Sequence, residues 1–82
     1  AGARALHEQV LAVRRRVLGE EHPDTTISAW NLFMSLLYLQ EVDAAREILV
    51  RHLAWLLQTD PQALSFEQQQ ILGWLEDMFY SP

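Results

Sequence analysis

The sequence predicts an all-α protein built from antiparallel helical hairpins. Apolar residues recur at intervals of three and four along most of the chain, short polar turns separate these periodic stretches, and no stretch gives a competing strand signal. We expect one helical domain over residues 1–82, with four helices at about 2–18, 24–40, 43–58 and 65–80.

The first expected helix carries an apolar stripe and ends in a recognisable turn. Gly19 fits the helix end, because glycine readily adopts the left-handed conformation found there. The basic residues 14–16 lie in the last turns, where the helix dipole favours positive charge, and we interpret them as a solvated side. The stripe that we expect to face inward consists of Ala3, Leu6, Val10, Val13 and Val17, with Leu11 and Leu18 on its flank.

The second expected helix is unusually apolar. Either Asp24 or Thr25 can cap its start. Between residues 27 and 39 the only residues that are not apolar are Ser28, Asn31 and Ser35, which form one narrow stripe. A helix of this composition must be covered on most of its sides.

The last two helices have clear inward faces. Ser65 followed by Gln68 matches a capping box and marks the start of the fourth helix. The inward face of the third helix is expected to contain Ala45, Ile48, Leu49, His52, Leu53 and Leu56. The buried stripe of the fourth is expected to contain Ile71, Leu72, Leu75, Met78 and Phe79.

The chain also resembles itself at a fixed spacing. A shift of 42 residues places Leu6 on Ile48, and a shift of 40 residues places Leu32 on Leu72. The first and third helices are therefore equivalent, as are the second and fourth. This arrangement predicts a helix-turn-helix repeat in the order B, A, B, A.

The first turn and the start of the third helix carry family motifs. Residues 13–25 read VRRRVLGEEHPDT, and residues 43–46 read DAAR. These segments resemble the long tetratricopeptide repeats of kinesin light chains and nephrocystin-like proteins, and the resemblance covers residues 1 to about 57. Ala3 and Ala45 match the small residue that this family has at the close contact between its A and B helices.

The resemblance implies a tetratricopeptide-like α-solenoid whose A helices line a concave groove for a peptide or helix of a partner protein. Asn31 is the most pointed candidate, because its amide can both donate to and accept from a bound backbone, although a hydrogen bond within the array or to water explains it equally well. Trp30 and Met34 have core packing as their alternative role. The groove residues implied on the second helix are Ile27, Trp30, Asn31, Met34 and Tyr38.

Several positions depart from the family pattern and indicate an atypical, capping repeat at the C-terminal end of a longer array. These positions are Phe33, Gln40, Val42 and His52. We also expect the apolar stripe of the first helix to need a cover. Either preceding repeats or a second copy would supply it, and the second case makes the chain a homo-oligomer through this open face.

Composition narrows the function classes. The net charge is −5, and residues 52–82 contain acidic side chains but no Lys or Arg, which argues against a nucleic-acid partner. There is no cysteine, no metal-ligand motif and no apolar run near the length of a membrane span, so we expect no cofactor, no metal and no membrane partner, and a soluble, cytoplasmic protein. The three histidines lack a catalytic motif, and we expect no enzyme.

Two function hypotheses remain. The first is a protein–protein interaction scaffold that binds a peptide or helix of a partner in its A-helix groove. The alternative is a structural capping or oligomerisation element of a larger signalling or multidomain protein, with no ligand of its own.

Overall fold

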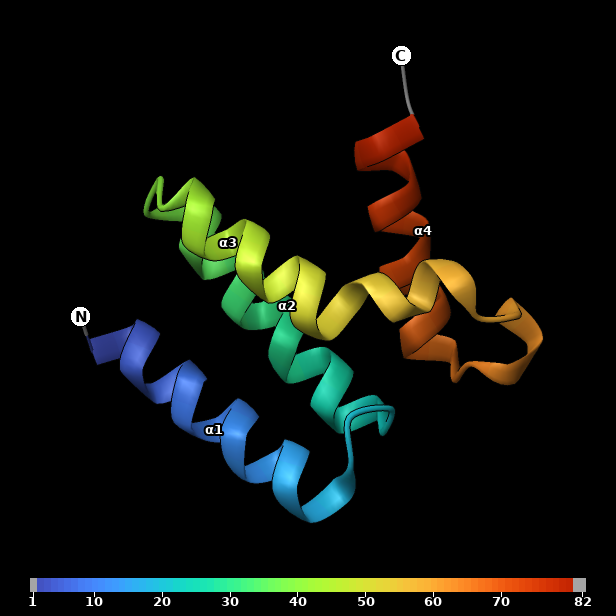
Figure 1. Cartoon of the computed structure of the whole chain (residues 1–82), viewed down its shortest axis with the longest axis horizontal. Coiled ribbons are helices and arrows are strands. Elements are labelled where there is room, and N and C mark those ends of the chain that lie inside the picture. Colours follow the sequence, from blue (N-terminus) through green and yellow to red (C-terminus); the bar gives the residue numbers. More distant parts are fainter. Residues whose placement is uncertain (1, 81–82) are drawn as a thin grey trace.

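Helices form the described part of the chain, which contains no strand. The computed structural model describes residues 2–80, with side-chain environments for residues 5–78. Helices α1 (Gly2–Leu18), α2 (Pro23–Tyr38) and α3 (Val42–Ile48) lie side by side and alternate in direction, and α4 (Phe66–Tyr80) crosses the end of this group steeply (Figure 1). The predicted all-α class with four main helices is confirmed.

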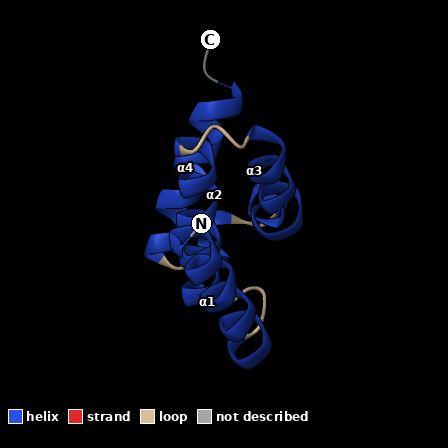
Figure 2. Cartoon of the chain, turned by 90° about the vertical axis from the view of Figure 1, so that its left-hand side faces the viewer, coloured by secondary structure: helices blue, strands red, loops and turns tan. Residues whose placement is uncertain are grey.

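Helix α2 is the central element of the fold. It contacts α1, α3 and α4. Seen from the side, α2 and α4 lie on one side of the molecule and α3 on the other (Figure 2). The two helices that the 40-residue shift makes equivalent are therefore neighbours in space, and they share one face of the molecule.

The turn between α1 and α2 depends on a glycine and a histidine. Gly19 has a φ of +96°, a conformation that side chains with a Cβ rarely adopt, and it ends α1 as predicted. The N-cap of α2 is His22, whose Nδ1 accepts a hydrogen bond of 3.1 Å from the backbone N–H of Asp24. The expected cap at Asp24 or Thr25 is wrong, because Pro23 already begins the helix and leaves both residues inside it.

The turn between α2 and α3 closes in a Schellman motif on a residue other than glycine. Gln40 has a φ of +63°. Its N–H donates to the carbonyl of Leu37 at 2.9 Å, and the N–H of Glu41 donates to the carbonyl of Leu36 at 2.8 Å. These two bonds satisfy carbonyls at the end of α2 and hold Gln40 in the left-handed region.

The segment predicted as a single helix over residues 43–58 changes its winding twice. After α3 it continues as a π-helical turn, η1 (Leu49–Leu53), and then as a 3-10 turn, η2 (Ala54–Gln58). A second 3-10 turn, η3 (Pro61–Ala63), leads toward α4. The expected inward face survives these changes, because Ala45, His52, Leu53 and Leu56 are all buried.

Helix α4 begins with the predicted capping box. The N–H of Gln68 donates to Ser65 Oγ at 3.1 Å, and the N–H of Ser65 donates to Gln68 Oε1 at 3.0 Å. The buried Gln68 amide also donates to the carbonyl of Glu21 at 2.9 Å and to Thr26 Oγ1 at 3.0 Å. One side chain therefore caps α4 and joins it to the turn between α1 and α2.

The hydrophobic core lies between the central helix α2 and its three neighbours. Its buried apolar residues are Leu11, Ala29, Leu32, Phe33, Leu36, Ala45, Leu53, Leu56, Leu64, Ile71, Leu72 and Leu75. His52 is a buried polar residue at the edge of this core, and its Nδ1 lies 2.6 Å from Glu20 Oε1.

The expected inward face of α1 is wrong. Leu6, Val13 and Val17 are exposed, Val17 to 70%, whereas the flanking Leu11 is only 4% exposed. The physical reason is that α2 packs against the side of α1 that carries Leu11, so the longer apolar stripe points elsewhere. Met78 is likewise half exposed instead of buried. The predicted roles of Ala3 and Phe79 lie outside the described side chains.

Candidate functional site

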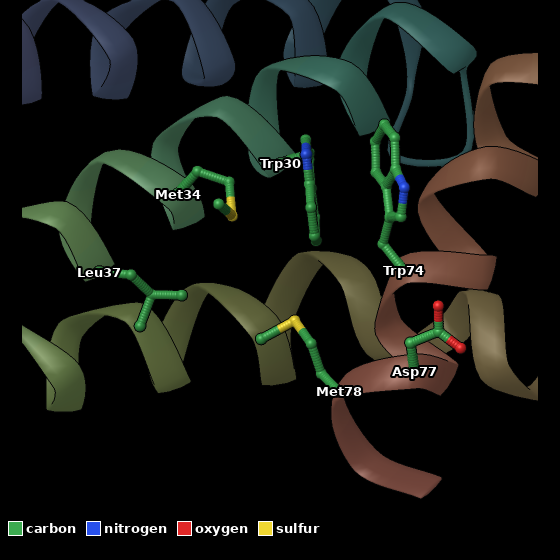
Figure 3. Close-up of a pocket in the computed structure, with 6 residues that line it drawn as sticks. All are labelled: Trp30, Met34, Leu37, Trp74, Asp77 and Met78. Carbon is green, nitrogen blue, oxygen red and sulfur yellow. The ribbon is translucent and has the colours of Figure 1, made fainter. Parts of the chain in front are cut away.

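The main hollow of the candidate site lies between α2 and α4, on the face that these two helices share. Its volume is about 630 Å³, within the usual range for ligand pockets. Two of the predicted groove residues, Trp30 and Met34, line it from α2 (Figure 3). The complete lining is Trp30, Met34, Leu37, Trp74, Asp77 and Met78.

Two tryptophans from different helices stack at the centre of this site. The rings of Trp30 and Trp74 lie 5.4 Å apart between their centroids, with an angle of 25° between their planes. Phe33 packs against Trp30 from the core side, with 5.5 Å between the two ring centroids. Figure 3 shows both indoles projecting into the space between α2 and α4. Because each ring is held by a neighbouring ring, the aromatic surface is ordered before any ligand arrives.

The remaining predicted residues extend the groove in both directions along α2. Ile27, Trp30 and Asn31 line a hollow of about 280 Å³ near the start of α2, and Tyr38 lines one of about 470 Å³ at its end, together with Met34. All five predicted residues thus lie along one succession of hollows. The side chain of Asn31 is exposed and makes no hydrogen bond to any residue with a described environment.

The structure adds side chains from α4 that the sequence prediction missed. Trp74, Met78 and Asp77 line the main hollow, and Glu67 lines the smaller one beside Ile27. The 40-residue shift was the signal that would have found three of them, since adding 40 to the predicted positions 27, 34 and 38 gives 67, 74 and 78, whereas Asp77 corresponds to Leu37, which was not predicted. The prediction used the A-helix positions of the second helix alone.

The groove is negatively charged. Asp77 is the charged member of the main hollow, and Glu67 is the charged member of the hollow next to it. Helix α2 contains no Lys or Arg, and neither does the sequence from residue 52 to 82. Neither Asp77 nor Glu67 has an ion-pair partner among the side chains that the structure describes. Both carboxylates are available to a ligand.

Within the described residues no three His, Asp or Glu side chains lie together as a bound metal ion would require. The helices of the same region are too short or too polar for any of them to cross a membrane. Two of the histidines have local partners, since His22 caps α2 and His52 contacts Glu20.

Comparison with known proteins links the first part of the chain to a repeat family. A family model of the tetratricopeptide repeat matches residues 1–24, which comprise α1 and the turn with Gly19 and Pro23. The match supports a tetratricopeptide repeat in this part of the chain. No curated protein and no solved structure matches the sequence. The kinesin-light-chain and nephrocystin-like type, and the resemblance over residues 25–57, stay predictions.

Proposed function

We propose that this chain is a protein–protein interaction module that binds a peptide or helix of a partner protein along the groove between α2 and α4. Tetratricopeptide repeats generally mediate binding between proteins, and residues 1–24 match such a repeat. The observation that carries the proposal is the main hollow, in which the predicted residues Trp30 and Met34 meet Trp74 and Met78.

The exposure of these side chains supports a binding role over a purely structural one. Met34 is 45% exposed and Trp74 is 47% exposed, although both are large and apolar. Burying a fully exposed side chain of this kind contributes about 1.5–3 kcal/mol, so covering the exposed half of each contributes roughly 1 kcal/mol. Tryptophan is also among the residues that most often dominate the binding free energy at interfaces. A segment that covers this hollow therefore has a strong anchor.

The finer features of the proposal come from the sequence. The motif at residues 13–25 supports the kinesin-light-chain and nephrocystin-like type of repeat. A cytoplasmic location is part of the same proposal, in keeping with a chain that has no cysteine for disulfides.

A peptide-display selection on the immobilised chain tests the groove. The selected peptides are expected to bind the Met34→Glu variant at least about tenfold more weakly, because a charge would replace an apolar contact. Asn31→Ala is expected to weaken binding about two- to fivefold, if its amide bonds the peptide backbone. Val50→Glu is the matched control, since Val50 is exposed on η1 and lines none of the hollows.

Circular dichroism must first show that all three variants are folded. Equal binding of the selected peptides to Met34→Glu, Asn31→Ala and the unmodified chain would contradict a role for the groove.

The alternative is a structural or oligomerising element, and the exposed face of α1 favours it. Leu6, Val13 and Val17 offer an apolar surface that a second copy of the chain can cover. Sedimentation velocity over a range of concentrations tests this alternative. A folded chain that stays monomeric at all concentrations would exclude self-association through α1.

A further inference from the structure

The groove places negative charge beside an exposed aromatic surface. Trp74 lines both the main hollow and the smaller one, so it lies between Asp77 and Glu67. Figure 3 shows Asp77 one turn beyond Trp74 on the same helix, and both side chains line the main hollow. A carboxylate next to an indole face is a suitable environment for a cationic side chain, because the ring quadrupole and the carboxylate both attract positive charge.

We propose that the segment bound in this groove is basic as well as apolar, with Arg or Lys on both sides of one large apolar residue. This inference rests on the proposed function and names the chemistry of its partner. The apolar residue packs on Trp30 and Trp74, which line both hollows and so lie between the two carboxylates. The two cationic residues lie on either side of Trp74, one toward Asp77 and the other toward Glu67. Arginine suits this position better than lysine, because its planar guanidinium can stack on an indole while it bonds a carboxylate.

The distance between the two carboxylates sets the spacing of the cations. Glu67 and Asp77 are ten positions apart on α4, which corresponds to about 15 Å along the axis at 1.5 Å per residue. An extended peptide covers about 15 Å in four or five residues at roughly 3.3 Å each. An extended partner therefore has its two basic residues four or five positions apart, with the apolar residue between them.

The wider charge distribution favours the same partner. All six arginines of the chain lie within residues 1–51, and α2, which forms one wall of the groove, contains none of them. Arg46 pairs with Asp43, and Arg51 pairs with Glu47. Glu76 on α4 and Asp60 at the start of η3 add to the negative charge of the C-terminal half of the chain. The negative charge of this region thus attracts a basic peptide before the two are in contact, and this attraction weakens as salt is added.

Three peptide libraries with the same randomised apolar centre test the charge preference. They differ only in the two flanking positions, which are Arg, Gln or Glu, placed five residues apart. Selection on the immobilised chain is expected to enrich binders from the Arg library far more than from the other two. Their Kd should rise several-fold between about 0.05 M and 0.5 M salt, because the contacts are exposed to solvent.

Substitutions then assign the charges. Asp77→Asn and Glu67→Gln are each expected to weaken an Arg-flanked binder about two- to fivefold, the usual range for exposed ion pairs. Glu76→Gln is the matched control, because Glu76 is on the same helix but lines neither hollow, and it should change the Kd less than twofold. Tryptophan fluorescence follows the titration.

The outcomes separate this inference from the proposed function. One outcome is that all three libraries are enriched equally, that Met34→Glu abolishes binding and that Asp77→Asn leaves it unchanged. This outcome would overturn the basic partner and would leave binding in the groove in place. Failure of all three libraries on the folded chain would overturn both. A third outcome is that the chain associates with itself and that Asp77→Asn removes this association. This outcome would assign the groove to a second copy of the chain and would overturn a separate partner.

Discussion

Helices α1 and α4 form opposite edges of the molecule and present different outer surfaces. The outer stripe of α1 is apolar, with Leu6, Val13 and Val17 in contact with solvent. The exposed side of α4 away from the groove is mainly polar, with Phe66 at its start as the exception. Covering an apolar edge with another helix lowers the free energy, because apolar surface leaves water, whereas covering a polar edge has no such benefit. The two edges thus differ in whether they are suited to further packing.

The two helices also differ in how they are attached. Among the described side chains α1 buries only Leu11, and polar links hold its C-terminal part, such as the 3.0 Å bond from Arg14 to Ser28 Oγ. Helix α4 is attached through a broader buried face that consists of Gln68, Ile71, Leu72 and Leu75. Burial therefore stabilises the α4 edge more than the α1 edge, and this difference can be measured.

The largest expected effect is that of Leu75→Ala. Leu75 is fully buried, and its truncation should lower the free energy of unfolding by about 3–5 kcal/mol. The matched change Leu11→Ala should lower it by about 2–3 kcal/mol, because Leu11 borders an open hollow of about 180 Å³ and its removal leaves less unfilled space. Urea unfolding measures both. An equal or larger loss for Leu11→Ala would contradict the comparison.

The next effect concerns the amide that attaches α4. Gln68→Ala should lower the free energy of unfolding by about 2–3 kcal/mol, because Thr26 Oγ1 and the carbonyl of Glu21 lose a buried donor. Ser65→Ala removes the capping bond alone and should cost about 1 kcal/mol. A double-mutant cycle in urea should show that the two losses are not additive. Strict additivity would mean that the capping box and the link to Thr26 act independently.

A smaller loss of stability is expected when the contact between Glu20, which follows α1, and His52 of η1 is removed. Glu20→Ala removes the 2.6 Å contact with His52 Nδ1 and the ion pair with Arg15 Nε at 3.1 Å. The loss should be about 1–2 kcal/mol, since Glu20 is partly solvated and exposed ion pairs contribute little. Glu21→Ala, at the neighbouring exposed carboxylate, should stay within about 0.5 kcal/mol of the unmodified chain. Similar losses for the two variants would indicate that the Glu20 link does not stabilise the α1 edge.

The smallest effect on stability is expected at the outer surfaces. Val17→Glu should change the free energy of unfolding by less than about 0.5 kcal/mol, because Val17 is 70% exposed. If copies associate through α1, the same variant should abolish this association in sedimentation velocity. Phe66→Glu is the control at the other edge, where the side chain is also 70% exposed. If only Phe66→Glu abolished the association, the interface between copies would lie on α4.

Features that depend on nearby residues were predictable from the sequence. Gly19 ends α1, and Ser65 and Gln68 form the capping box, because both motifs are determined within a few positions. The cap at His22 was missed, since a histidine is a less common cap than the aspartate two residues later.

Features that depend on neighbours in space were harder to predict. Periodicity identified the apolar stripe of α1 but could not tell which side α2 would cover, so Leu11 was placed on the flank. The α2 half of the groove followed from the family resemblance. The α4 half needed the stacking of Trp30 on Trp74, which joins residues far apart in the sequence.

The two changes of winding after α3 have opposite signs. In η1 the N–H of Ala54 donates to the carbonyl of Leu49, a five-residue step that turns the chain less per residue than an α-helix. In η2 the chain turns more, by about 120° per residue against about 100°. The two rotations act in opposite senses, and apolar side chains stay on the core side through both turns, since Leu53 in η1 and Leu56 in η2 are fully buried. Neither turn can relax to an α-helix alone without rotating the following side chains out of the core.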